Sequence, residues 1–459
     1  YIVEVIEKTY LKSSSFQLLQ NWSVRYLLES RFSYNEKFEL VPIGSFLKKS
    51  RNRIKIENGK VYQRVTVKIN NGGVIPRDTE IGENIGTKIQ YEIKPGQFLM
   101  SKIDARNGAL GLVPPNLDGA IVTNDFPVFD VDKTKINPEF FVLITTAKEF
   151  IQFAQNCSSG TTNRQRIDID LFLSVKVPLP SIPLQNRIVE GYIKKIKEAD
   201  ILEQKAQKLE DGIESFLSNE LGIERDKRKN KSFGLQTISF KEINRWALSY
   251  LFKEQRFSMD KVKYPIVPLK TLITFFKGGK TPSTSRKEYW GGEINWTSAK
   301  DMKSLFLDSV QDKITEKAIG ETKLEVYPKG TILGVFRSGI LRHSFPVTLT
   351  QIETAINQDL KAIGVNDEVI LEEYFLFYLK TFQKMILERA QKFGVTVESV
   401  NTDEFLEIPV VLPPLPVQEG IVKSIRGRLN EINELRSDSA SLKESAIKEF
   451  ENEIFQPCN

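Results

Sequence analysis

The feature that most constrains this chain is a stretch that occurs in it twice. Residues 177–189 read VPLPSIPLQNRIV, and residues 410–422 read VVLPPLPVQEGIV. In each copy an apolar, strand-like run ends at prolines and continues into a charged, helix-forming segment. Self-similarity of this kind indicates a duplicated structural unit, so we expect the fold to contain the same globule twice.

The duplication extends far beyond these two stretches. SFQLLQNWSVRYLL (15–28) matches SFKEINRWALSYLF (239–252), which pairs Trp22 with Trp246 and Tyr26 with Tyr250. Further matches follow in the same order: 40–47 with 266–273, 94–108 with 328–339, 122–129 with 356–363, 137–145 with 371–379, and 168–180 with 401–413. The paired aromatic residues lie beside apolar residues in both halves, and we assign them to packing.

Each half mixes strands and helices. Short β-rich runs such as KVYQRVTVKI are separated by Gly, Asn and Pro turns. By contrast, PEFFVLITTAKEFIQFAQ and EEYFLFYLKTFQKMILERAQ have apolar residues at helical spacing. The predicted fold class is therefore α+β, with two tandem globules built on mixed sheets.

A long helical pattern follows each half. From Gln185 to Leu221 and from Gln418 onward, apolar residues recur at steps of three and four with Lys and Glu between them, as in a coiled-coil seam. We expect the two helices to pack antiparallel, since each needs a partner for its apolar stripe, and to relate the globules by a pseudo-two-fold axis. They either only tie the halves together or also act as a ruler, because roughly 35 residues span about 50 Å.

The composition excludes several classes of catalytic site. The chain has 459 residues, enough for two or more cores, but one histidine (His343) and two cysteines (Cys157 and Cys458). Paired-His and Cys-based zinc sites are thereby excluded, and the scarcity of cysteine fits a reducing cytoplasm. In FFKGGKTPS, Thr274 stands where a phosphate-binding loop needs its first glycine. We predict no catalytic centre, no cofactor and no metal site in this chain.

Charge and the chain's beginning add two expectations. The net charge of +6 is compatible with a polyanionic partner. The first residues, YIVEVIEKTYLK, have neither an initiating Met nor a signal-peptide core. We therefore expect the sequence to begin inside a longer polypeptide.

One enzymatic alternative stays open at this point. Asp78 followed by Glu92, Ile93 and Lys94 imitates the Asp…Glu-x-Lys pattern with which many nucleases hold a magnesium ion. Such a spacing also arises by chance in a chain with this many charges. Lys94, Pro95 and Gly96 form a turn signal before a strand, and the turn is the interpretation that we favour.

On these features the chain resembles the specificity subunit of type I restriction–modification systems. The resemblance rests on the exits PLPSIPLQNRIV and LPPLPVQEGIV, each before a coiled-coil helix, and on GGKTPSTSRKEYWGGEINWTSAKDM (278–302), which is similar to the opening of many target recognition domains. It implies a non-catalytic DNA reader for a bipartite, gapped target in host defence. The alternatives are the specificity half of a single-chain restriction–modification enzyme and a coiled-coil scaffold that binds no DNA.

The resemblance also implies partners and a division of the chain. Its partners are double-stranded DNA, two methyltransferase subunits that dock on the spacer helices and use S-adenosylmethionine, and restriction subunits that use ATP and magnesium. The implied segments are an N-terminal extension (1–14), target recognition domain 1 (15–180), a central spacer helix (181–224), a linker (225–238), target recognition domain 2 (239–413) and a C-terminal spacer helix (414–459).

Candidate DNA contacts are basic and amide side chains on loops beside a rigid sheet, because Lys and Arg bind phosphates while Arg, Lys, Asn and Gln read base edges. In the first domain the candidates are Arg64, Lys68, Asn70, Asn71, Arg77, Lys102, Arg106, Asn107, Asn163, Arg164 and Arg166. In the second domain they are Lys277, Lys280, Thr281, Ser283, Ser285, Arg286, Trp296, Ser298, Lys300, Arg337, Arg342 and Lys392. A scaffold would need no such convergence of cations from separate loops onto one face.

Overall fold

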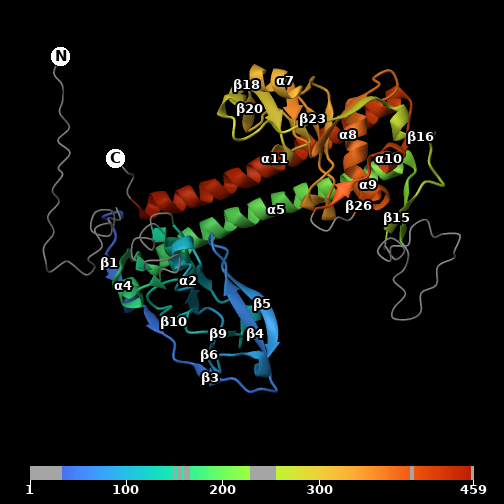
Figure 1. Ribbon diagram of the computed structural model, residues 1–459. Coiled ribbons are helices and arrows are strands. Elements are labelled where there is room, and N and C mark those ends of the chain that lie inside the picture. The colour runs from blue at the N-terminus through green and yellow to red at the C-terminus, as the bar shows by residue number, and fades with distance from the viewer. Residues whose placement is uncertain are drawn as a thin grey trace, which may run out of the picture. The chain divides into compact units, whose positions relative to one another are not determined.

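The computed structural model describes residues 34–147, 150–151, 158–159, 166–227, 255–392 and 397–455 (Figure 1). The paired aromatic residues of the sequence repeat (Trp22, Tyr26, Trp246 and Tyr250), the N-terminal extension and most of the linker at 225–238 lie outside these residues. The chain divides into two compact units. The first unit comprises Tyr1–Ile201 and Asp438–Asn459, and the second comprises Leu202–Ser437. The domain boundaries given above stay predictions.

Among the described residues, the first unit contains two main sheets and two short strand pairs. One sheet has the order β3 (Arg53–Lys55), β6 (Ile89–Glu92), β9 (Ile121–Val122), β4 (Val61–Val67) and β5 (Val74–Ile81). The other has the order β2 (Leu47–Lys49), β10 (Val128–Val131), β7 (Phe98–Met100) and β8 (Leu110–Leu112). Because β4 and β9 run parallel while their other neighbours run antiparallel, the first sheet is mixed.

Aromatic side chains fill the core of the first unit. Helix α2 (Pro138–Thr146) begins at Asn137, whose side chain accepts hydrogen bonds from two free backbone N–H groups of the first turn. It buries Phe141, whose ring centroid lies 4.9 Å from that of Phe98 on β7. Helix α4 (Ile169–Ser174) adds Phe172, whose ring stacks on that of Phe98 with 6.3 Å between the centroids. Helices α2 and α4 thus share one aromatic core with the sheet.

Within its described residues, the second unit likewise has one five-stranded and one four-stranded sheet. One sheet has the order β17 (Ile273–Gly278), β25 (Leu360–Val365), β22 (Ile332–Val335), β23 (Val347–Thr350) and β19 (Phe306–Leu307). The other has the order β20 (Asp312–Ile314), β18 (Trp290–Thr297), β24 (Thr354–Ile356) and β21 (Val326–Tyr327). Each contains one parallel pair, β19 with β23 and β18 with β24, so both are mixed.

Helices α8 (Glu372–Thr381), α9 (Gln383–Ala390) and α10 (Thr402–Leu406) complete the second unit. Most of α8 is buried, which explains its apolar sequence. The hydroxyl groups of its two tyrosines donate to backbone carbonyls of β28 (Pro409–Val411), from Tyr374 to Val411 at 2.6 Å and from Tyr378 to Pro409 at 2.9 Å. These bonds satisfy the buried hydroxyls and attach α8 to the strand before the second proline exit.

The exits themselves are paired alike in the two units. In the first, β13 (Lys176–Pro178) runs antiparallel to β1 (Leu40–Pro42). In the second, β28 runs antiparallel to β16 (Ile266–Pro268). The prediction of two tandem α+β globules with mixed sheets is therefore confirmed, and the pseudo-two-fold relation between them stays a prediction.

Two 40-residue helices follow the exits, α5 (Ile182–Leu221) and α11 (Leu415–Ile454) (Figure 1). In the first unit, Lys195 donates to the Ser445 hydroxyl at 2.8 Å, and Lys443 lies 3.3 Å from the Asp200 carboxylate. The Ser439 hydroxyl is buried and donates to the carbonyl of Ala199 at 2.9 Å. Residue numbers rise on α5 as they fall on α11, so the pairing is antiparallel.

The parts of α5 and α11 in the second unit pair in the same sense. Arg436 forms ion pairs with Glu203 at 3.3 Å and Glu210 at 2.6 Å. Beside them Ala206 packs against Ile432 and Leu435. The predicted packing of two long helices on one another is thus confirmed. None of the helices in the described part of the chain combines the length and the apolarity that crossing a membrane requires.

A buried glutamine at the start of each long helix connects that helix to its globule. The Gln185 carbonyl accepts from the backbone N–H of Asn137 at 2.7 Å, and its amide donates to the carbonyl of Pro180 at 2.8 Å. Gln418 repeats this arrangement with Leu371 at 2.9 Å and Pro413 at 2.8 Å. Both glutamines are 0% exposed. One amide therefore joins the proline exit, the helix start and the segment before α2 or α8.

We predict that Gln418→Leu lowers the free energy of unfolding by about 2–4 kcal/mol, because it leaves buried backbone groups without partners at a cost of about 1–3 kcal/mol each. Denaturant unfolding followed by circular dichroism measures the change. Gln207→Leu is the matched control, since Gln207 is exposed and its side-chain amide donates to Asp211 of the next helical turn. A loss for Gln418→Leu no larger than that of the control would show that the glutamine does not anchor the helix.

Candidate nucleic-acid interface

Four segments of the first unit lie together, and all of them except the turn at 123–126 carry predicted DNA contacts. They are the loop at 68–73 between β4 and β5, the segment at 101–108, the turn at 123–126 between β9 and β10, and β12 (Arg166–Ile167). The backbone N–H of Asn70 donates to the carbonyl of Asn107 at 2.7 Å, and that of Lys102 donates to the carbonyl of Asp125 at 2.9 Å. The N–H of Ile167 in turn donates to the carbonyl of Lys102 at 2.9 Å. The tertiary fold thus brings separate loops to one place.

The loop at 68–73 needs an unusual backbone. Asn70 and Asn71 have φ angles of 56° and 59°, a left-handed conformation that asparagine tolerates better than most residues. The Asn71 amide donates to the carbonyl of Thr146 at 3.0 Å. A Cβ atom at Gly108 would lie 2.4 Å from the Asn71 side-chain oxygen. Asn71 therefore positions the loop within the fold, and Gly108 permits the close approach.

The exposed cations of these segments differ in how they are partnered. Among the described residues, the ammonium groups of Lys68 and Lys102 form no ion pair, and Lys68 is exposed. Arg166 is exposed and pairs with Asp125, with 3.0 Å between Nη2 and Oδ1. Asn107 is exposed next to the half-buried Arg106. Lys68, Lys102, Asn107 and Arg166 define what we call the first recognition face.

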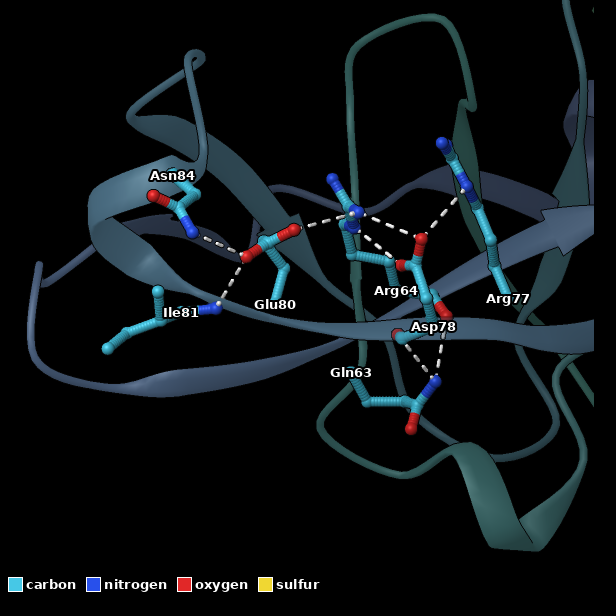
Figure 2. A network of polar contacts seen from close by, with 7 residues as sticks. All are labelled: Gln63, Arg64, Arg77, Asp78, Glu80, Ile81 and Asn84. Carbon is cyan, nitrogen blue, oxygen red and sulfur yellow. Dashed lines mark hydrogen bonds and ion pairs between the residues drawn. The ribbon is translucent and has the colours of Figure 1, made fainter. Parts of the chain in front are cut away.

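Arg64 lies on β4 in a network of carboxylates (Figure 2). Its Nε and Nη2 atoms donate to the two carboxylate oxygens of Asp78 at 2.6 and 2.8 Å, and Glu80 lies 3.4 Å from Nη2. Arg77 approaches the same Asp78 carboxylate at 3.5 Å. The hydrogen bond from Arg64 lowers the pKa of Asp78 below its ordinary value and raises the pKa of Arg64 above its own. Arg64 is thus committed to binding two carboxylates of the neighbouring strand.

The same geometry decides the nuclease alternative. Asp78 lies on β5 and Glu92 on β6, and the strand order β6, β9, β4, β5 places two strands between them. Three strand spacings amount to about 14 Å, so the two carboxylates cannot share one metal ion. The Glu92 carboxylate instead accepts from the Asn52 amide at 3.3 Å, and the Gln97 side chain bonds to the backbone N–H of Lys94 in the turn. The turn interpretation is therefore correct for this segment.

The Asp78–Arg64 pair predicts a pH dependence. Because the pKa of Asp78 is lowered in the folded chain, the pair stabilises the fold above about pH 4, the range of an ordinary Asp pKa, and this contribution is lost as the pH falls through the lowered pKa. We expect Asp78→Asn to unfold at lower urea concentration than wild type at pH 6, with the difference shrinking as the pH falls below about 4. Asp118→Asn, which removes a carboxylate from an exposed turn, is the control. A difference that persists undiminished at pH 2 would contradict this origin.

In the second unit the turn at 356–359 between β24 and β25 collects the candidate segments. The carbonyl of Ile356 accepts from the backbone N–H of Lys280, and the N–H of Asn357 donates to the carbonyl of Thr297, both at 3.0 Å. The Thr281 hydroxyl donates to the Gln358 side chain. Asp359 pairs with Arg337, with 2.8 Å between Oδ1 and Nε. Segments at 278–281, 297–300 and 336–337 therefore meet at this turn.

Most of the predicted cations of the second unit form exposed ion pairs of their own. Such pairs contribute only about 0–1 kcal/mol each, so a phosphate group can compete for the cation. The pairs are Lys277 with Glu325, Arg286 with Glu321, Lys300 with Asp312, and Arg337 with Asp359. Arg342 pairs with Glu398, whose side chain is 4% exposed, so this pair is not an exposed one. Lys280 donates to the Thr322 carbonyl, Ser283 and Ser285 bond to each other, and Lys392 is exposed on β26 (Gln391–Lys392).

Two candidates of the second unit are not at the surface. Trp296 is 6% exposed; its indole N–H donates to the carbonyl of Lys280 at 3.2 Å, and its ring packs edge-to-face on Trp290. Ser298 is 8% exposed and caps the turn that contains Asp301. Both side chains are buried and stabilise the loops by packing and hydrogen bonding. The prediction that they contact DNA is therefore not retained. Asn163 and Arg164 lie outside the described residues.

Comparison with known proteins gives a consistent result. The family model described as "Type I restriction modification DNA specificity domain" matches residues 35–211 and 261–438. The chain is 28% identical over 301 residues to the type I restriction enzyme EcoR124I/EcoR124II specificity subunit of Escherichia coli, which covers 64% of this chain and 63% of that protein. It is 24% identical over 361 residues to the HindI specificity subunit of Haemophilus influenzae, covering 70% and 77%.

A further relative and a solved structure extend the comparison. The MjaIX specificity subunit of Methanocaldococcus jannaschii is 30% identical over 179 residues, or 38% of this chain and 40% of that protein. The match thus spans less than two thirds of the length of the Escherichia coli and Methanocaldococcus relatives. A chain solved in a study of complex assembly and conformational transition of the type I R-M system has a TM-score of 0.57 at 16% identity, covering 93% of this chain and 100% of that chain. That similarity concerns the fold alone.

Proposed function

Because the chain belongs to the family of type I restriction–modification specificity domains and contains two of them in tandem, we propose that it reads a bipartite, gapped sequence in double-stranded DNA. Each domain reads one half-site. The chain itself is non-catalytic, and binding of the two half-sites selects the DNA on which partner subunits act.

The observation that carries this proposal is the convergence of basic side chains from separate loops in each unit. Lys68, Lys102 and Arg166 come from three segments of the first unit that are hydrogen-bonded to a common framework. Around the turn at 356–359, Lys280 and Arg337 come from two segments of the second unit. A scaffold that binds no polyanion has no use for this placement, whereas phosphates require it.

The two half-sites are expected to differ in sequence. The N–H groups of Lys102 and Phe336 make the same hydrogen bond in the two units, to Asp125 and Asp359, yet one residue is a cation and the other an apolar ring. Phe336 is 5% exposed and packs in the core, so the second unit has no cation at the place of Lys102. The two units therefore present different sets of donors, and different donors select different bases.

The two long helices supply the spacing and the docking surface. We propose that α5 and α11 set the gap between the half-sites and bind two copies of a methyltransferase subunit, which restriction subunits join. In this scheme S-adenosylmethionine belongs to the methyltransferase, and ATP and magnesium belong to the restriction subunit, so this chain holds no cofactor. The same specificity module within a single-chain restriction–modification enzyme is the alternative assembly.

Selection of bound sequences from a randomised duplex pool tests the proposal. The selection is run at near-physiological salt with the chain alone and with its methyltransferase partner. We expect enrichment of a gapped motif with two unlike halves. If no sequence is enriched even with the partner present, the DNA-reader proposal fails and the scaffold interpretation replaces it.

A further inference from the structure

The turn that gathers the loops is built alike in the two units, although the side chains around it differ. In the first unit, the backbone N–H of Phe126 donates to the carbonyl of Thr123 at 3.0 Å, and in the second, that of Leu360 donates to the carbonyl of Asn357 at 3.4 Å. The third residue of each turn is an aspartate, Asp125 or Asp359. The turns thus correspond residue by residue.

The backbone carbonyl of each aspartate accepts a hydrogen bond from the segment that follows β7 or β22. The Asp125 carbonyl accepts from the N–H of Lys102 at 2.9 Å, and the Asp359 carbonyl accepts from that of Phe336 at 2.8 Å. The carbonyl of Lys102 accepts from Ile167 of β12, and that of Phe336 accepts from Val400 of β27 (Ser399–Val400), both at 2.9 Å. Lys102 therefore corresponds to Phe336, and Ile167 corresponds to Val400.

The backbone hydrogen bonds are the same in the two units, but the arginine that pairs with the aspartate comes from a different segment in each. In the first unit Asp125 pairs with Arg166, the residue before Ile167. In the second, Asp359 pairs with Arg337, the residue after Phe336. The place of Arg337 is taken in the first unit by Ile103, and the place of Arg166 is taken in the second by Ser399. Arg337 and Ser399 are themselves bridge partners, so the two places face each other across neighbouring segments.

We propose that Asp125 and Asp359 are positioning residues that hold one arginine on the recognition surface of each domain. This arginine can be supplied from either of two facing positions, the one occupied by Arg337 in the second unit or the one occupied by Arg166 in the first. The inference rests on the proposed function, because it names the surface that reads each half-site. The arginine contacts the DNA, and the aspartate acts through it.

The exposure of the pairs favours this role over a purely structural one. The side chains of Arg166 and Arg337 are 59% and 61% exposed, and those of Asp125 and Asp359 are 44% and 25% exposed. Solvent therefore reaches both ion pairs, and such pairs contribute little to stability. Asp125 meets Arg166 at Nη2 and Asp359 meets Arg337 at Nε. A guanidinium has five N–H donors, so each arginine keeps donors for a phosphate or a guanine edge while the carboxylate limits its orientation.

Moving the arginine between the two places tests the inference. We expect Arg337→Ile to lose preference at the second half-site by roughly 5- to 100-fold, the range of one specific base contact, and Arg337→Ile with Ser399→Arg to recover most of it. The first half-site is the internal reference in every selection. The converse pair, Arg166→Ser alone and with Ile103→Arg, repeats the test on the first half-site. Lys270→Ile, which breaks the exposed pair with Glu407, controls for loss of one surface charge.

Asp359→Asn separates positioning from charge. This variant keeps Arg337 but removes its carboxylate partner, so we expect weaker base preference at the second half-site with the salt dependence of binding retained. Wild type that selects neither half-site would refute the proposed function itself. If the wild type selects both half-sites, and the Arg337→Ile and Asp359→Asn variants select both half-sites with unchanged preference, this inference fails while the proposed function stands. A folded double variant no better than Arg337→Ile would refute the exchange between the two places.

Discussion

Removing one heptad from each long helix at matched positions is expected to shorten the gap of the selected DNA motif by about three base pairs. Seven helical residues span about 10.5 Å, and one base pair occupies about 3.4 Å of the duplex. Residues 202–208 of α5 and 432–438 of α11 are suitable for deletion. Glu203 in the first stretch pairs with Arg436 in the second, so the double deletion removes both partners together. Selection from a randomised pool, compared with wild type, measures the gap.

Deletion of residues 202–208 from α5 alone is the control for this experiment. It leaves α11 at full length, so Arg436 loses its partner Glu203 and the apolar seam around Ile432 loses Ala206. A shift of the seam leaves apolar side chains without partners, and we expect a lower melting temperature with weak or no selection. An unchanged gap after the matched double deletion would show that the helices do not set the spacing.

Replacing Lys68, Lys102 and Arg166 by alanine together is expected to lower affinity for the specific duplex by about 100-fold or more at near-physiological salt. A cation that neutralises one phosphate contributes about 0.9 to the slope of log K against log salt. The slope should therefore decrease by up to about three in magnitude. Sequence preference should be lost at the first half-site and kept at the second, since the second unit is untouched.

A variant of equal charge provides the matched comparison for the triple alanine variant. Lys48, Lys133 and Lys176 are exposed lysines of the same unit that lie outside the converging segments. Their joint replacement by alanine removes the same net charge, and we expect a much smaller change in slope. Equal changes in the two triple variants would mean that binding follows net charge and that the first recognition face does not exist.

The sequence predicted the architecture well because the signals for it are local and repeated. The proline exits, the apolar steps of α5 and α11 and the order of elements in each half could all be recognised from neighbouring residues. Gln185 and Gln418 stand inside the quoted exit motifs, yet their function as buried anchors appears only when Asn137 and Leu371 are placed beside them.

The candidate site was predicted less completely. Arg64 and Lys68 are both cations of one hairpin, and nothing in the sequence around them separates their roles. The register of β4 with β5 sets Arg64 opposite Asp78, which commits it to a carboxylate, while Lys68 beyond the strand end stays exposed. Trp296 similarly occurs in a loop-like sequence, but the packing of Trp290 and the carbonyl of Lys280 bury it.

The aspartates of the two turns also show which features could be predicted from the sequence and which required the structure. Asp125 and Asp359 occupy equivalent places in the repeated segments at 122–129 and 356–363, so the sequence alone could have indicated them. That each binds an arginine, Arg166 in one unit and Arg337 in the other, depends on which strand the fold brings alongside. Periodicity and duplication are properties of the chain and could be determined from the sequence by itself. Only the tertiary structure decided the partners of the charged side chains, because those partners are distant in sequence and meet through sheet register and packing.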